Sequence, residues 1–185
     1  YLGHDPELFN DSVRNNVLLG DDYDVFEYLR AVCMDKEVEA MEQGADTIIG
    51  SEGIRLSGGQ AQRIALARML CHKKLVLVLD DPFSALDRNT EEQIYKKLKD
   101  MASDNIVILI SHRLYMFPKM DKVIWMDAGK ANVGTHKELM LECPGYRKMY
   151  ETVSVEECRT VETENEGLAA AKVVENSRRV VDKHE

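Results

Sequence analysis

The 185-residue chain lacks several features that would assign it to common classes. It has no uncharged apolar run near the length of about 20 residues that spans a bilayer, and no signal peptide opens it. Its four cysteines form no CxxC pair and no histidines cluster with them, so we expect reduced thiols rather than a zinc site or a disulfide framework. The formal net charge of -9 argues against a nucleic-acid partner, because such proteins usually carry a basic patch.

The chain also lacks an initiating methionine and any internal repeat. Tyr1 opens what reads as the middle of a domain, so we expect a fragment of a longer protein. Past residue 150 the sequence becomes polar and rich in glutamate, which predicts a disordered or loosely attached tail over residues 151–185.

Continuous apolar runs indicate the fold class. Residues 75–81, "LVLVLDD", form such a run, and strands without polar alternation are typical of a parallel sheet covered on both faces. A second buried strand is predicted in residues 105–110, and a third strand in residues 122–127. Helices are predicted over residues 60–71 and 90–101, the second with a capping box formed by Thr90 and Gln93. This alternation predicts an α/β fold with a mainly parallel sheet.

A pair of glycines precedes the first long helix, in the stretch "GIRLSGGQAQR" over residues 53–63. Ser57 and Gln60 have the spacing of a capping box, which explains a helix start. It does not explain Gly58 and Gly59, since each glycine costs roughly 0.5–1 kcal/mol relative to alanine within a helix. An anion that approaches the free amides at the helix N-terminus would explain them.

Four motifs together resemble the C-terminal half of the nucleotide-binding domain of ABC transporters, of the exporter type. They are "LSGGQ" at 56–60, "LVLVLD" at 75–80, "SALD" at 84–87 and "SHR" at 111–113. The resemblance covers about residues 1–150. It implies a P-loop NTPase-like sheet with a helical subdomain over residues 1–60 and the C-terminal part of the RecA-like ATP-binding core over residues 61–150.

The resemblance also implies roles for single residues. In this family two nucleotide-binding domains pack head to tail, and each ATP lies between the Walker motifs of one domain and the signature of the other. The signature residues would therefore contact the γ-phosphate of ATP held mainly by a partner; these are Ser57, Gly58, Gly59 and Gln60.

The other motifs supply the remaining candidates. Asp80 would bind Mg²⁺ at the end of its strand, His112 would contact the γ-phosphate and the attacking water, and Asp87 would reach across the dimer and couple the two sites. Structural alternatives stay open at this point. Residues 57–60 and Asp80 would also serve as plain helix or loop caps, His112 as a structural histidine and Asp87 as a turn acid before the next helix.

Three departures from the family pattern affect the expected activity. The phosphate-binding sequence G-x-x-x-x-G-K-[ST] is absent, as is the aromatic residue that stacks on adenine. Asp81 stands where the family usually has the catalytic glutamate, and His4 where it has a glutamine that contacts Mg²⁺ and water. Ser51 stands where exporters often have glutamate. We therefore expect this fragment alone to be inactive, and the assembled protein to be one half of a heterodimeric exporter with a degenerate site of its own. A homodimer that hydrolyses ATP with Asp81 stays open, because aspartate is still a carboxylate.

Two other function classes remain open. A soluble ABC-type ATPase of DNA or ribosome maintenance shares these motifs, and a non-catalytic regulatory half of a heterodimer would also fit. The exporter resemblance implies transmembrane domains as partners and a place at the cytoplasmic face of the membrane. We also expect the strand over residues 75–80 to lack a neighbouring strand and to expose apolar surface.

Overall fold

The computed structural model describes residues 1–51, 53–101 and 105–153. It divides into two compact units, one from Tyr1 to His112 and one that begins at Arg113. The predicted subdomain boundary at residue 60 lies inside the first unit and stays a prediction. Residues 154–185 of the predicted tail lie outside the described residues. Within the described ranges, no helix combines the length and apolar character that a membrane crossing requires.

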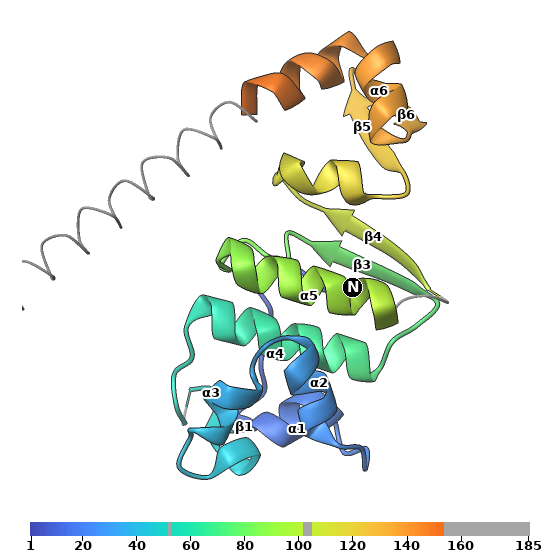
Figure 1. Ribbon diagram of the computed structural model, residues 1–185. Coiled ribbons are helices and arrows are strands. Elements are labelled where there is room, and N and C mark those ends of the chain that lie inside the picture. The colour runs from blue at the N-terminus through green and yellow to red at the C-terminus, as the bar shows by residue number, and fades with distance from the viewer. Residues whose placement is uncertain (52, 102–104, 154–185) are drawn as a thin grey trace, which may run out of the picture. The chain divides into compact units, whose positions relative to one another are not determined.

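The first unit begins with short helices gathered beside one longer helix (Figure 1). The short helices are α1 (Val13–Leu18), α2 (Val25–Ala31) and α3 (Asp35–Glu39), and the long one is α4 (Gly58–Cys71). A 3-10 turn, η1 (Gly44–Asp46), leads into β2 (Ile48–Ile49), which pairs antiparallel with β1 (Asp11–Ser12). The apolar side chains between these helices are fully buried, among them Val13, Val17, Leu29, Ile64 and Leu66.

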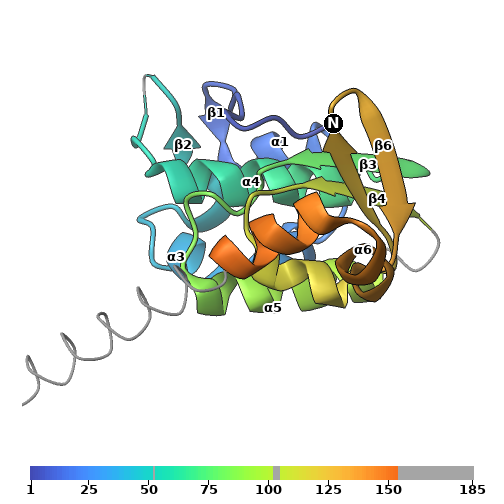
Figure 2. The same cartoon turned by 90° about the horizontal axis from the view of Figure 1, so that it is seen from above.

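A parallel strand pair forms the other part of this unit. β3 (Val76–Asp80) and β4 (Ile106–Ile110) run side by side in both views, in a register that pairs Asp80 with Ile110 (Figures 1 and 2). Leu2 extends the pair at the other edge of β3, where its amide donates to the carbonyl of Val78 at 2.8 Å and its carbonyl accepts from the amide of Asp80 at 2.9 Å. The parallel pairing predicted from the apolar runs is confirmed.

The expectation that β3 has no neighbouring strand is wrong, because β4 lies on one side and Leu2 on the other. The prediction that β4 is a buried strand is also wrong. Leu77 and Leu79 are buried on one face of the pair, but the alternate side chains Ile106, Ile108 and Ile110 are exposed. Exposed apolar surface, as expected from the sequence, therefore lies on the opposite face of this pair.

Helix α5 (Arg88–Met101) begins two residues before the predicted start and with a different cap. The carboxylate of Asp87 accepts from the amide of Thr90 at 3.0 Å and from its hydroxyl at 2.6 Å. The predicted capping box of Thr90 and Gln93 is wrong, because Asp87 already takes the Thr90 amide. The amide oxygen of Gln93 instead lies 3.7 Å from the thiol sulfur of Cys33.

The second unit is built around a β-hairpin. β5 (Val123–Asp127) pairs antiparallel with β6 (Lys130–Gly134), and the two turn residues, Ala128 and Gly129, both have positive φ, as a two-residue hairpin turn requires. The 3-10 helix η2 (Leu114–Lys119) precedes the hairpin and α6 (His136–Glu142) follows it. The predicted strand at 122–127 therefore exists, but it pairs with a strand that the sequence analysis did not predict, and antiparallel.

Candidate functional site

The glycine turn of residues 57–60 forms the N-terminus of α4. Ser57 has an extended backbone, and its hydroxyl oxygen accepts from the amide of Gln60 at 3.2 Å. The side-chain oxygen of Gln60 accepts in return from the amide of Ser57 at 2.8 Å. The predicted capping box is thus confirmed, with both side chains of the pair used inside the turn.

The two glycines of this turn differ in their surroundings. A Cβ atom on Gly59 would lie 2.7 Å from the carbonyl oxygen of Ala85, so the close approach of the chain segment before α5 explains this glycine. A Cβ atom on Gly58 would meet nothing within 4 Å. The first amides of a helix have no intrahelical acceptor, and in the described part of the chain neither glycine amide has another partner. Nothing in the packing of the described residues requires a glycine at position 58.

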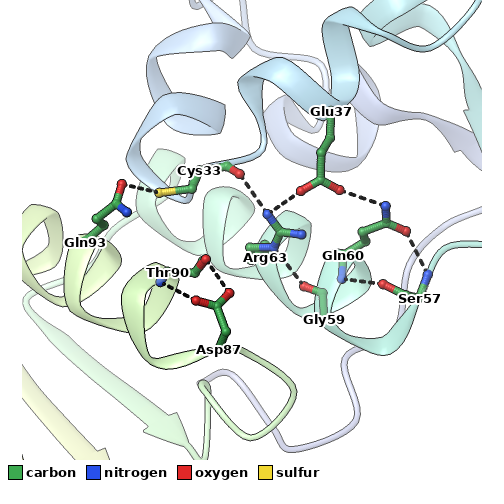
Figure 3. A network of polar contacts seen from close by, with 9 residues as sticks. All are labelled: Cys33, Glu37, Ser57, Gly59, Gln60, Arg63, Asp87, Thr90 and Gln93. Atoms are coloured by element: carbon green, nitrogen blue, oxygen red, sulfur yellow. Dashed lines mark hydrogen bonds and ion pairs between the residues drawn. The ribbon is translucent and has the colours of Figure 1, made fainter. Parts of the chain in front are cut away.

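A network of charged and polar side chains lies behind the turn (Figure 3). The carboxylate of Glu37 on α3 accepts from the side-chain amide of Gln60 at 2.8 Å and lies 2.7 Å from the guanidinium of Arg63. Arg63 also donates to the carbonyls of Cys33 at 2.7 Å and Gly59 at 3.2 Å. The first turn of α4 is therefore fastened to the preceding helical segment by hydrogen bonds.

Asp81 brings together three of the predicted site residues. Its Oδ2 atom lies 3.3 Å from Nδ1 of His112 and 3.7 Å from Nδ1 of His4, although these residues come from three separate segments of the chain. The side chain of Asp81 is only 16% exposed, whereas those of His112 and His4 are 73% and 58% exposed. In the described residues, Oδ1 of Asp81 is buried without a hydrogen-bond partner.

The backbone of Asp81 is held in an uncommon conformation. Its φ is 47°, in the left-handed region that few residues other than glycine adopt. Its amide donates to the carbonyl of Ile110 at 2.8 Å, and its carbonyl accepts from the side chain of Gln62 at 3.3 Å. Gln62 is buried on α4, so the helix that carries the glycine turn also holds the backbone of Asp81.

Asp80 ends β3 at the edge where ligands bind in open α/β sheets. The phenol of Tyr1 donates to its Oδ2 atom at 2.9 Å, and this hydrogen bond raises the pKa of Tyr1. Among the described residues no group of three potential ligands would hold a metal by itself. Mg²⁺ needs only one or two protein carboxylates when phosphates and waters complete its shell, so the Asp80 carboxylate and the unpartnered buried oxygen of Asp81 fit this ion. His4 lies beside Asp81 and offers an imidazole, which Mg²⁺ favours less than oxygen.

Asp87 has a role that the structure accounts for within the chain. Both of its carboxylate oxygens bind Thr90, and these hydrogen bonds lower the pKa of Asp87. The structure therefore shows Asp87 as an acid that caps the turn before α5, which is the structural alternative named above. The predicted contact across a dimer stays a prediction.

No motif in the sequence predicts a role in the site for Glu37, Gln62 or Arg63. Gln62 and Arg63 directly follow the glycine turn, and their polarity inside an otherwise apolar helix was the available indication. Glu37 lies 23 residues before Gln60, and no local pattern connects the two.

Known proteins resemble this chain in sequence and in fold. The family model described as "ABC transporter" matches residues 1–84. The ATP-dependent lipid A-core flippase of Alcanivorax borkumensis is 38% identical over 149 residues, which cover 77% of this chain and 26% of that protein. The probable multidrug resistance ABC transporter ATP-binding/permease protein YheI of Bacillus subtilis is 35% identical over 156 residues, 82% of this chain and 27% of that protein.

A solved structure of a bacterial Atm1-family ABC exporter with ATP bound matches with a TM-score of 0.74 and 31% identity. The match covers 81% of this chain and 27% of that one, so the chain spans about a quarter of the length of these relatives. The fold is that of a P-loop NTPase domain in part. Residues 1–84 match the ABC transporter family, and the alignment with ABC exporters over most of the chain is consistent with a partial ABC ATPase domain.

Proposed function

We propose that this chain is part of an ATP-driven exporter, in which the N-terminus of α4 contacts the γ-phosphate of an ATP held by a partner nucleotide-binding domain. The observation that carries the proposal is the environment of Gly58. Among the described residues its amide has no hydrogen-bond partner, and the space where a side chain would stand is open. A residue that costs helix stability and serves no packing purpose fits a turn that must admit a ligand.

The Ser57 hydroxyl and the amides of Gly58 and Gly59 are the donors in this proposal. The oxygen of Ser57 accepts from the Gln60 amide, which leaves its hydroxyl hydrogen available to an acceptor. Gln60 contributes indirectly, because its side chain is fully used in the capping box and in the contact with Glu37. A phosphate would therefore meet hydrogen-bond donors at the positive end of the helix dipole.

The chain's own acidic site forms the second part of the proposal. Asp80 would hold Mg²⁺, which when bound neutralises charge on the phosphates. Asp81 would polarise the attacking water, and the exposed imidazole of His112, 3.3 Å from its carboxylate, would contact the γ-phosphate and that water. Asp87 would contribute to coupling between the two composite sites of the dimer.

We further propose that this site is degenerate and that the partner is a different chain. Aspartate is one methylene shorter than glutamate, and misplacing a catalytic group by about 1 Å can cost on the order of 10²-fold in rate. Both histidines converge on the same oxygen of Asp81, so the carboxylate is already engaged by groups of its own chain. The intact glycine turn would then serve the competent site of the partner.

In this proposal the chain lies at the cytoplasmic face of a membrane, associated with transmembrane domains. The relatives that are named as flippase and ATP-binding/permease proteins support an exporter over a soluble ATPase. Single-turnover ATP hydrolysis by the assembled exporter tests the proposal. Gly58→Glu places a carboxylate against the γ-phosphate and is expected to stop turnover, whereas Asp81→Asn is expected to leave most of it.

Each of the two variants tests a different claim. If Gly58→Glu hydrolyses ATP normally, the phosphate contact is refuted. If Asp81→Asn stops turnover as completely as Gly58→Glu does, the site is not degenerate and the heterodimer proposal is wrong.

A further inference from the structure

We propose that Glu37 and Arg63 are positioning residues that hold the glycine turn of α4 in shape through the side chain of Gln60. The proposal concerns the conformation of the turn itself. Its consequence for nucleotide rests on the function proposed above, but its test does not.

The side chain of Gln60 is bound at both ends. Its oxygen accepts from the amide of Ser57 at 2.8 Å, and its nitrogen donates to Glu37 at 2.8 Å (Figure 3). A side-chain amide that made only the capping contact would be free to rotate away from it. Glu37 removes that freedom and keeps the oxygen of Gln60 directed at the Ser57 amide.

Arg63 fixes Glu37 in turn. Its guanidinium lies 2.7 Å from the second carboxylate oxygen of Glu37 and also binds the carbonyls of Cys33 and Gly59. The planar guanidinium presents donors in several fixed directions, which suits a group that joins a carboxylate to two backbone carbonyls. The contact with Gly59 returns to the turn, so Glu37, Gln60 and Arg63 form a closed set of interactions around it.

The burial of Arg63 distinguishes this network from ordinary surface ion pairs. The side chain of Arg63 is 12% exposed and that of Glu37 is 40% exposed. A comparable pair, Arg14 with Asp46, has the same distance of 2.7 Å, but its side chains are 41% and 67% exposed. Exposed pairs contribute little because water screens them, whereas the Arg63 guanidinium has exchanged water for contacts with three groups, the Glu37 carboxylate and the carbonyls of Cys33 and Gly59, and depends on them.

Glu37 connects the glycine turn to a helix that lies well before it in the sequence. Glu37 lies on α3, a short helix that precedes the turn by about 20 residues in the chain, and its side chain reaches the turn through Gln60 and Arg63. A turn that is already in its binding conformation loses less entropy when a ligand arrives. The network therefore preorganises the donors at Ser57, Gly58 and Gly59.

Amide hydrogen exchange on the full chain tests this proposal. The amides of Ser57, Gln60 and Ala61 report on the turn, because each is hydrogen-bonded inside it. Glu37→Ala is expected to accelerate exchange at these amides by roughly fivefold or more, the effect of losing one or two hydrogen bonds. Amides in the ladder between β3 and β4 are expected to keep their rates.

Two further variants complete the design. Glu37→Gln retains one acceptor for Gln60, so its exchange rates are expected to lie between those of the wild type and Glu37→Ala. Arg14→Met is the matched control, because it removes an equally short ion pair that does not contact the turn, and it is expected to leave the turn unchanged.

The proposal is overturned if Glu37→Ala leaves exchange at the turn unchanged, or if it accelerates all protected amides by the same factor. Glu37 is on the surface of a short helix, so its replacement by alanine is compatible with folding. If the turn responds as expected but Gly58→Glu does not affect hydrolysis in the assembled exporter, the positioning role stands and the proposed phosphate contact fails.

Discussion

The carbonyl oxygen of Ala85 lies 2.7 Å from the point where a Cβ atom would stand on Gly59. The glycine turn of residues 57–60 and the segment that leads into α5 are thus in close backbone contact within one chain. In the same helix, the side chain of Gln62 binds the carbonyl of Asp81. The elements expected to serve two different ATP sites are joined through α4.

This contact predicts opposite effects for the two glycines. Gly59→Ala is expected to destabilise the chain by about 1–3 kcal/mol, because the added methyl group meets backbone that cannot move aside cheaply. Gly58→Ala is expected to leave stability unchanged or to raise it by up to about 1 kcal/mol, since alanine is the better helix former and the space is open. Urea unfolding of both variants measures the difference. Equal destabilisation by the two substitutions would contradict the assignment.

The short side chain of Asp81 predicts that a longer carboxylate at this position increases the rate of ATP hydrolysis. In the proposed exporter, Asp81→Glu is expected to raise the single-turnover rate at the chain's own site by up to about 10²-fold, because the longer side chain has the reach of the glutamate usual in the family. His4→Gln, which removes one of the two imidazoles near Oδ2, is the companion variant. A rate that stays at the wild-type level in both variants and in their combination would mean that the short carboxylate does not limit this site.

The pKa of Glu37 predicts how the turn responds to acid. Burial acts to raise this pKa, but hydrogen bonds from Arg63 and Gln60 outweigh it, so the folded-state pKa lies below the usual value of 4.5. The unfolded chain therefore binds the proton more readily, and the stabilisation is present above pH 4.5 and is lost as the pH falls below it. The difference in unfolding free energy between the wild type and Glu37→Ala, measured by urea unfolding across this range, is expected to shrink on acidification. A difference that does not change with pH would contradict an ionised Glu37 in the network.

Two of the seven tyrosines, one in each unit, are expected to make stability depend on pH in the alkaline range. Burial raises the pKa of Tyr28 in the first unit and of Tyr146 in the second to about 12 each, with a smaller contribution from Cys71 and from Tyr150, respectively. Because the unfolded pKa is 10.0, the stability that depends on the neutral phenols is present below pH 10 and falls as the pH rises toward 12.

Ultraviolet absorbance titration follows this ionisation directly. Tyr146→Phe is expected to remove one late-titrating group, and it also removes the 2.7 Å hydrogen bond between the phenol and His136. Tyr23→Phe is a suitable control, since Tyr23 is exposed. If the group that Tyr146→Phe removes titrates near the usual tyrosine pKa of 10.0, the buried position of Tyr146 is wrong.

Much of the fold follows from local patterns in the sequence, and the exceptions have physical reasons. The apolar runs located β3, β4 and β5, and the spacing of Ser57 and Gln60 located the start of α4. The strand β6 was not predicted, because "KANVG" contains one large apolar residue and depends on pairing with β5. The cap of α5 was misassigned because two residues with cap chemistry, Asp87 and Thr90, lie three positions apart.

The candidate site was also predictable only in part. The residue types at positions 80, 81 and 112 were recognised from their motifs, but only the fold places His4 and His112 on one oxygen of Asp81. The connection of Glu37 to the turn is a tertiary contact between α3 and α4 that no spacing rule describes. Gly59 would have been assigned to phosphate binding from sequence alone, whereas its neighbour Ala85 gives it a packing role.

The central claim is that Gly58 is kept free of a side chain for a nucleotide phosphate. The most direct test is the ATP-dependent association of this chain with a complete ABC nucleotide-binding domain, measured in the presence of Mg²⁺ with ATP or with ADP. The account predicts association with ATP but not with ADP for the wild type, and its loss in Gly58→Ala although that variant folds at least as stably. Undiminished ATP-dependent association of Gly58→Ala would contradict it.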